Sequence, residues 1–327
     1  MARLNPIMAN AMQATRLDPL TEAGAIIGRL REVQEGKRKA RLVSTGFYSL
    51  DKATNGYMPS TLWVLGARPA IGKTTFFVAS ANRAAHRGAG VLGFALEVGR
   101  EQIMARIMAD LSHTGRGGVD FKSIMSQVVE HQGILSLERV AERLGGMLLV
   151  IDVPSRLTPA DIRVRVRTEK ARMAARGHTF DVVFIDYLKQ VQASDRYKGN
   201  RVYEVGEISY SLKQIAKDEG VCIVLLVQLN RALETRENKR PILSDLRESG
   251  DLKADADVVA FLHRESVHIE NSPDFIAQKD DAVAAWVEAR NKAEIILAKN
   301  RAGPTETVHL WCDMAFSTMA DQARGQP

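Results

Sequence analysis

A stretch of ten residues between two apolar segments constrains the fold of this chain more than any other feature. Residues 66–75 read GARPAIGKTT, follow the apolar segment 61–65 and precede a second apolar segment, 76–80. The first segment has the length of a buried strand, and the second is typical of the start of a buried helix. This order predicts a phosphate-binding loop, because the backbone N–H groups and the dipole at a helix N-terminus favour an anion.

Three residues of this loop have predicted roles in binding a nucleoside triphosphate. Gly72 allows the backbone to approach phosphate, Lys73 brings a positive charge to the β and γ oxygens, and the Thr74 hydroxyl is a Mg²⁺ ligand. The usual motif has glycine at the position of Ala67, but a methyl group there requires only a negative φ. A chance turn between a strand and a helix is the alternative. The predicted ATP-binding residues are Arg68, Pro69, Ala70, Ile71, Gly72, Lys73, Thr74 and Thr75.

Two other apolar segments end in polar residues suited to a nucleotide site. The apolar residues 182–185 lead to Asp186, and residues 221–227 lead to Gln228. If both are parallel strands, their ends meet at the edge where open α/β sheets bind ligands. We predict that Asp186 holds Mg²⁺ opposite Thr74 and that the Gln228 amide senses the γ-phosphate. The alternatives are a strand that happens to end in aspartate and an ordinary loop residue.

Strand-like and helical segments alternate along most of the chain, which predicts an α/β fold with a mostly parallel central sheet covered by helices. Helical patterns are clear at residues 100–111 and 158–175, and the second begins with a capping hydroxyl, a proline and an acid. The expected strands are residues 61–65, 91–96, 147–152, 181–186, 221–227, 258–263, 293–299 and 307–311.

The amino-terminal part of the chain has a different character. Residues 1–18 are expected to form a flexible tail, and residues 19–42 an amphipathic linker helix followed by a basic connector. The apolar stripe of this helix must be buried either on its own domain or on a neighbouring subunit. The nucleotide-binding domain is expected to span residues 43–320 with a charged insert at 265–291, and residues 321–327 are expected to be a second tail.

Charge and cysteine usage narrow the class of protein further. The chain has 327 residues and a formal net charge of +6, which permits a polyanionic partner. No apolar run is long enough to cross a bilayer and the amino terminus lacks a signal-peptide core, so a cytoplasmic protein without membrane contact is expected. Cys222 and Cys312 lie in apolar strand-like segments and are expected to be reduced core residues.

Several separated motifs together resemble the RecA-like motor domain of the DnaB-type replicative DNA helicases. The resemblance runs from about Thr45 to Trp311, and the Arg-Pro pair in the phosphate-binding loop and residues 245–250 (DLRESG) are its most specific parts. The family tolerates alanine at the position of Ala67. The motifs occupy residues 66–75, 96–97, 185–188, 228–231, 244–250, 255–257 and 299–304.

The resemblance implies roles for residues around the predicted nucleotide. Glu97 matches the family's catalytic base, which orients and deprotonates the attacking water, although an acid near a helix N-terminus is favourable on its own. Lys73, Thr74 and Asp186 match the phosphate and Mg²⁺ ligands, and Gln228 matches the γ-phosphate sensor. The implied cofactors are ATP and Mg²⁺.

Two further groups are implied to act outside the subunit's own nucleotide site. Arg301 matches the arginine finger and lies beside Lys299, and both reach into the ATP site of the adjacent subunit in this family. A solvated strand end is the alternative for this pair. Arg247, Glu248 and Gly250 match the channel loop that grips the phosphates of single-stranded DNA.

The activity implied is that of a homo-oligomeric ring, expected to be a hexamer. Such a ring hydrolyses ATP, translocates on single-stranded DNA and unwinds duplex DNA during replication. The sequence departs from the family at Lys189 and Val227, and only about forty residues precede Thr45 where members carry a helical domain that contacts primase. The alternatives are a non-motor regulator or capping subunit of another helicase ring, and a RecA-like DNA repair ATPase. A helicase loader or replisome protein is a further expected partner.

Overall fold

The computed structural model of the chain describes residues 17–37, 42–194, 197, 199–230, 233, 234, 236, 238–246 and 250–322. The chain divides into two units, Met1–Leu42 and Val43–Pro327. Residues 1–16 and 323–327, which make up most of the two predicted tails, lie outside the described residues.

A single sheet of nine strands forms the centre of the second unit, as far as the chain is described. The strand order is β3-β2-β4-β5-β1-β6-β7-β8-β9. Pairing from β3 to β6 is parallel, and β7, β8 and β9 continue the sheet in antiparallel fashion. The predicted α/β fold with a mostly parallel sheet is therefore confirmed. The strands are β1 Leu62–Ala67, β2 Val91–Ala95, β3 Leu149–Asp152, β4 Val182–Asp186, β5 Cys222–Gln228, β6 Val258–His263, β7 Lys292–Asn300, β8 Thr307–Asp313 and β9 Thr318–Asp321.

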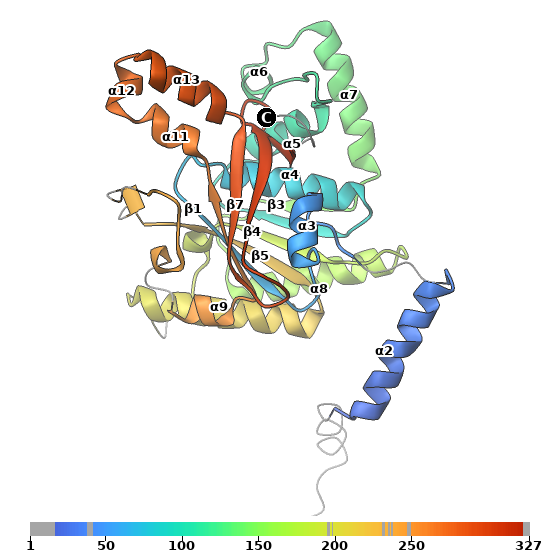
Figure 1. Ribbon diagram of the computed structural model, residues 1–327. Coiled ribbons are helices and arrows are strands. Elements are labelled where there is room, and N and C mark those ends of the chain that lie inside the picture. Colours follow the sequence, from blue (N-terminus) through green and yellow to red (C-terminus); the bar gives the residue numbers. More distant parts are fainter. Residues whose placement is uncertain are drawn as a thin grey trace, which may run out of the picture. The chain divides into compact units, whose positions relative to one another are not determined.

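Helices cover both faces of this sheet because alternate residues of each buried strand point to opposite sides. In β1, Trp63 and Leu65 enter one core, and Leu62 and Val64 enter the other. The first core packs against α3 (Tyr48–Thr54), α4 (Lys73–His86) and α5 (Arg100–Ser112). The second packs against α8 (Pro159–Ala174), α9 (Arg201–Glu219) and α10 (Gly250–Asp255), and Figure 1 shows these layers.

The last strand shows where the sequence prediction stopped too early. β9 was not predicted, and residue 321 was assigned to the tail, whereas Asp321 belongs to β9. Its carboxylate accepts hydrogen bonds from the backbone N–H groups of Tyr48 (2.6 Å) and Ser49 (2.9 Å). An acid at a helix N-terminus satisfies free N–H groups and is favoured by the helix dipole. The end of the sheet thereby holds α3, which the sequence analysis also missed.

The predicted insert is helical. Residues 265–289 form α11 (Glu265–Glu270), α12 (Pro273–Ile276) and α13 (Asp280–Ala289) between β6 and β7. The side chains of this segment contact one another through Trp286, which donates to Glu270 (2.6 Å) and packs on Phe275. Two other helices, α6 (Phe121–Met125) and α7 (His131–Gly145), follow α5.

The first unit contains one described helix, α2 (Pro19–Gln34). It begins with Asp18 as its N-cap, whose side chain accepts from the N–H of Thr21, and with proline at its first position. None of its residues is buried, and Leu20 and Leu30 of the predicted apolar stripe are exposed. Among the described residues no helix is both long and apolar enough to cross a membrane.

Both cysteines are buried in the second unit and are not in a disulfide. Burial raises the pKa of the Cys222 thiol to about 12 and that of Cys312 to about 11. A thiol that stays protonated at neutral pH is a poor nucleophile and metal ligand. Both residues therefore behave as core residues.

Candidate active site

Parallel strands bring Glu97, Asp186 and Gln228 to one edge of the sheet. In the order β2-β4-β5-β1, these strands all end at this edge. Glu97 follows β2 by two residues, Asp186 ends β4 and Gln228 ends β5. The register places Ala95 beside Asp186 and Ala67 beside Gln228. The residues are distant in sequence, and the sheet alone makes them neighbours.

The phosphate-binding loop has the conformation that its small residues allow. It leaves β1 after Ala67, whose φ is ordinary, and turns through left-handed conformations at Ala70 (φ 63°) and Gly72 (φ 115°). Gly72 is the N-cap of α4, so the backbone N–H groups that follow it are free to bind an anion. A Cβ on Gly72 would lie 3.2 Å from the sulfur of Met314. The loop is thus closed against the turn between β8 and β9.

Gly72→Ala is expected to weaken ATP binding by roughly tenfold or more, because a side chain at this φ costs about 1–3 kcal/mol and the methyl group would press on Met314. Gly88→Ala is a matched control, since Gly88 has a similar φ of 90° but open space around its Cβ position. Both variants should lose thermal stability, and titration with a fluorescent ATP analogue should show weaker binding only for the first. Equal affinities would contradict the assignment of this loop.

Thr74 and Asp186 lie in direct contact at the carboxyl edge. The Thr74 hydroxyl donates to Oδ2 of Asp186 at 2.7 Å. The other carboxylate oxygen, Oδ1, is buried and has no hydrogen-bond partner among the described groups. An unpartnered buried carboxylate oxygen next to a hydroxyl is the kind of oxygen pair that Mg²⁺ binds. The residues present therefore fit the predicted Mg²⁺.

Lys73 and Glu97 interact electrostatically with Asp186. Burial lowers the pKa of Lys73, and the nearby carboxylates of Asp186 and Glu97 oppose the shift. Burial raises the pKa of Asp186, against the Thr74 hydrogen bond and the charge of Lys73. The turn that carries Glu97 is fixed to β4, because the N–H of Leu96 donates to the carbonyl of Asp186 (2.8 Å). Glu97 itself is exposed and open to a ligand.

The raised pKa of Asp186 gives a pH prediction. The folded-state pKa of Asp186 lies above the unfolded value of 3.8, so the native state holds its proton to higher pH. The free energy of unfolding of the nucleotide-free protein should therefore fall as pH rises from 3.8 through the folded-state pKa. Because Mg²⁺ requires the ionised carboxylate, Mg²⁺ binding should release protons at mildly acidic pH and weaken as pH falls. Calorimetric Mg²⁺·ATP titrations in two buffers of different ionisation enthalpy measure this release. Asp186→Asn should remove its contribution, and an unchanged release would contradict the assignment.

Arg68 connects the loop to the end of β5. Its guanidinium donates to the carbonyl of Leu229 (2.7 Å) and to the Glu234 carboxylate, and only 8% of the residue is exposed. Leu229 directly follows Gln228, so Arg68 fixes the backbone next to the predicted sensor. The structure shows this link, and a contact of Arg68 with ATP stays a prediction. A cavity of about 640 Å³ opens beside these strand ends and is lined in part by Arg68, Tyr187, Gln228 and Asp245.

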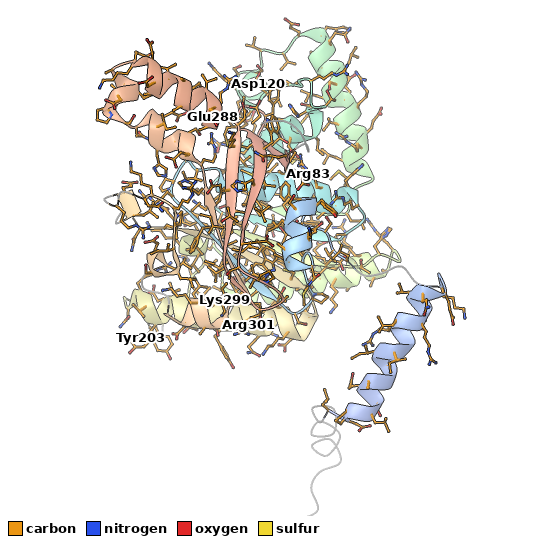
Figure 2. The ribbon with its side chains drawn as sticks, in the orientation of Figure 1. Arg83, Asp120, Tyr203, Glu288, Lys299 and Arg301 are labelled. Atoms are coloured by element: carbon orange, nitrogen blue, oxygen red, sulfur yellow. The ribbon has the colours of Figure 1, made fainter. Side chains whose placement is uncertain are left out.

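Lys299 and Arg301 lie at the opposite edge of the sheet. β7 is antiparallel to β6, and its residue Asn300 pairs with Val258 at the start of β6. Figure 2 shows both side chains at the end of the β7–β8 hairpin. β1 has six residues, which at ~3.3 Å each separates this edge from the subunit's own phosphate-binding loop by about 17–20 Å. Neither side chain can reach its own site.

The predicted DNA-binding residues are described only in part. Arg247 and Glu248 lie outside the described residues, and Gly250 is the first residue of α10. An added Cβ on Gly250 would meet nothing within 4 Å, so packing alone does not require glycine there. The DNA-binding role of these residues stays a prediction.

Two charged residues near these sites escaped the sequence analysis. Arg106 packs on the Phe121 ring (4.3 Å), donates to Ser317 (3.1 Å) and has a pKa lowered by burial and opposed by Asp186. Asp257 lies within a recognised motif, yet no role was predicted for it. Both make contacts between segments far apart in sequence, which spacing does not reveal.

The sheet order, the phosphate-binding loop and the carboxylate at the end of β4 define a RecA-like P-loop nucleotide-binding domain. Residues 43–321 match the family described as DnaB-like helicase C terminal domain, and the chain belongs to this family. The predicted resemblance is thereby confirmed.

Similar proteins and structures agree with this assignment. The replicative DNA helicase DnaB of Haemophilus influenzae is 38% identical over 276 residues, which covers 84% of this chain and 54% of that protein. The replicative DNA helicase DnaB of Leifsonia xyli subsp. xyli is 34% identical, and the match covers 93% of this chain and 62% of that protein. The chain thus spans about half the length of the curated relatives it matches.

Two solved structures share the fold. A solved ATPase domain has a TM-score of 0.77 at 25% identity, and the match covers 92% of this chain and 98% of that domain. A DnaB-like replicative helicase, described with its interactions with primase, has a TM-score of 0.75 at 26% identity. The match covers 92% of this chain and 66% of that chain. The RecA-like architecture predicted from the sequence is confirmed.

Proposed function

We propose that this chain is the ATP-hydrolysing motor of a ring helicase that translocates on single-stranded DNA and unwinds duplex DNA during replication. The membership of the chain in the DnaB-like family and its relatives named replicative DNA helicases support this function. The proposed cofactors are ATP and Mg²⁺, and the proposed assembly is a homo-oligomer, expected to be a hexamer.

One observation carries the proposal. Lys73, Glu97, Asp186 and Gln228 belong to one edge of the sheet, and Arg301 belongs to the other. A guanidinium stabilises the charge that develops on the transferred phosphoryl group, so the site is incomplete until a second copy brings its Arg301. This arrangement supports a ring in which hydrolysis depends on assembly.

The chain's own groups divide the chemical work. Lys73 and the N–H groups at the start of α4 hold the triphosphate, and Glu97 orients and deprotonates the attacking water. Gln228 contacts the γ-phosphate, and Thr74 and Asp186 hold Mg²⁺, which neutralises phosphate charge when it is bound. Arg247, Glu248 and Gly250 contact the DNA backbone. An interaction with primase is a further proposal, supported by the DnaB-like helicase described with its interactions with primase. A helicase loader or replisome protein is another proposed partner.

The mass of the protein, measured with an ATP analogue and single-stranded DNA, tests this function. A closed ring of several subunits, together with ATP-dependent unwinding of a forked duplex, is the expected result. A protein that stays monomeric under every nucleotide and DNA condition yet hydrolyses ATP at full rate would overturn the proposal. Assembly without unwinding would instead favour a regulator or capping subunit of another ring.

A further inference from the structure

Asp257 lies between β1 and the end of β7 and receives donors from three segments. Its Oδ2 accepts from the N–H of Leu62 (2.8 Å) and from the ammonium of Lys213 in α9. Its Oδ1 accepts from Nη1 of Arg301 (3.2 Å), and its carbonyl accepts from the Arg301 N–H (3.0 Å). The side chain is 11% exposed. This carboxylate therefore links Arg301 to the first residue of the strand that ends at the phosphate-binding loop.

The last turn of α10 receives the remaining contacts of the pair. Nη2 of Arg301 donates to the carbonyl of Ala254 (2.9 Å), and the Lys299 ammonium donates to the carbonyls of Lys253 and Ala254. Carbonyls at a helix C-terminus have no partner within the helix and carry partial negative charge, which favours cations. Two cations thus share one set of acceptors.

These acceptors belong to a rigid part of the domain. α10 packs on α9 through Leu252, which is fully buried, and through Asp255, which accepts from the Ser209 hydroxyl. Asp257 is held to α9 by its ion pair with Lys213. The Arg301 side chain, held by Asp257 and the Ala254 carbonyl, therefore keeps one position relative to the sheet.

The Arg301 side chain is nevertheless 55% exposed. A guanidinium has five N–H donors in a planar fork, and only two contacts to acceptors of the same subunit are described. The other donors are available to a phosphate that approaches from outside. Because the side chain is already ordered, less conformational entropy is lost when that phosphate binds.

We propose that Asp257 is the positioning residue of the arginine finger and that, with the carbonyls of α10, it presents Arg301 to the γ-phosphate of a nucleoside triphosphate bound by the neighbouring copy. This inference rests on the proposed function, since it requires Arg301 to act in trans. It adds a residue that does not contact ATP yet controls hydrolysis in the next subunit.

The test must not leave a buried charge without a partner. Asp257→Asn alone would remove the carboxylate that pairs with Lys213, whose side chain is only 10% exposed, and would destabilise the fold. The variant is therefore Lys213→Met with Asp257→Asn, and Lys213→Met alone is the matched control. Asparagine keeps one oxygen for the Leu62 N–H and presents its NH₂ group to Arg301, so the acceptor that faces the finger is lost.

The experiment uses mixed rings, in which each active site combines two kinds of subunit. Subunits with Glu97→Ala supply only a finger, and subunits with Arg301→Ala supply only a triphosphate pocket. Lys213→Met, alone or with Asp257→Asn, is placed on the finger-supplying subunit. We expect kcat of the mixed rings to fall about tenfold with the Asp257→Asn subunit, as for the loss of a charge-assisted hydrogen bond, with KM for ATP changed less than about twofold.

The outcomes separate the two proposals. If the control pair regains turnover and the Asp257→Asn pair matches it, Asp257 does not position the finger, and the proposed function stands. If Glu97→Ala and Arg301→Ala subunits that keep Lys213 and Asp257 also stay inactive when mixed, the finger does not act in trans, and both proposals fail.

Two further variants distinguish positioning from a structural role. On an Arg301→Ala background, Asp257→Asn with Lys213→Met should change residual turnover less than about twofold relative to Arg301→Ala alone, because no finger is left to position and no buried charge loses its partner. A further loss there would overturn the proposal. Asp257→Glu keeps the charge near Lys213 and the fold while moving the carboxylate by one methylene, so it should also lower kcat in mixed rings. Full turnover with this variant would contradict the role.

Discussion

Lys73→Ala is expected to reduce ATP turnover by roughly 10²–10³-fold, the typical loss when one preorganised charge at a reacting phosphate or carbonyl is removed. Lys73 is the first residue of α4, and burial lowers its pKa while the carboxylates of Asp186 and Glu97 oppose this shift. A partly buried ammonium near two acidic groups gains most from a bound triphosphate. Steady-state phosphate release in the presence of single-stranded DNA measures the effect.

The fold should tolerate the change. Removal of the ammonium relieves a desolvation cost, so the midpoint of thermal unfolding without nucleotide should not fall, whereas the stabilisation by ATP should disappear. Lys217→Ala, at an exposed position of α9, is the matched control and should behave like the unchanged protein. Normal turnover by Lys73→Ala would show that the catalytic site lies elsewhere.

Arg301→Ala is expected to lower turnover by about 10³–10⁵-fold, the range for loss of an arginine finger. ATP binding should change little, because the phosphate-binding loop of the same chain lies at the far edge of the sheet. Mixing these subunits with Glu97→Ala subunits should restore part of the turnover, since each inactive subunit then supplies what the other lacks. Phosphate release as a function of the mixing ratio measures this rescue.

The mixing curve has a definite shape if the finger acts in trans. Turnover should be close to zero for either variant alone and highest near equal proportions. Mixing Glu97→Ala with Lys73→Ala subunits is the control, because both defects fall in the same half of the site and cannot complement. A flat curve, in which mixing with Arg301→Ala subunits restores no turnover, would mean that one subunit does not complete the site of another. This result would contradict the proposed ring.

The local motifs predicted the elements of the fold well because their signals are short-range. The strand before the phosphate-binding loop, the capping box of α8 at Thr158 and Asp161, and β6 appear in the structure at or near the predicted residues. β9, one of the elements that the sequence analysis missed, is short, and its stability comes from pairing with β8 and from its contact with α3. Periodicity within a four-residue segment cannot indicate such partners.

The candidate active site also combines features that local sequence predicts with contacts that only the tertiary structure shows. The residue types at the strand ends, with the helix start at Lys73, are readable from the chain because phosphate binding requires a particular local backbone. The contact of Thr74 with Asp186 joins residues 112 positions apart, and the contact of Arg301 with Asp257 spans 44 positions. Such contacts follow from strand order and register, which spacing alone does not give.

The sequence by itself therefore determined the chemistry that this chain carries: a phosphate-binding loop, a carboxylate and an amide at strand ends, and a cationic pair at the end of a later strand. Only the tertiary structure decided where these groups lie relative to one another. The pairing of antiparallel β7 with parallel β6 puts Arg301 at the amino edge of the sheet, away from its own phosphate-binding loop and in contact with Asp257. The physical reason is that the direction and order of strands depend on long-range hydrogen bonding and core packing rather than on local propensity.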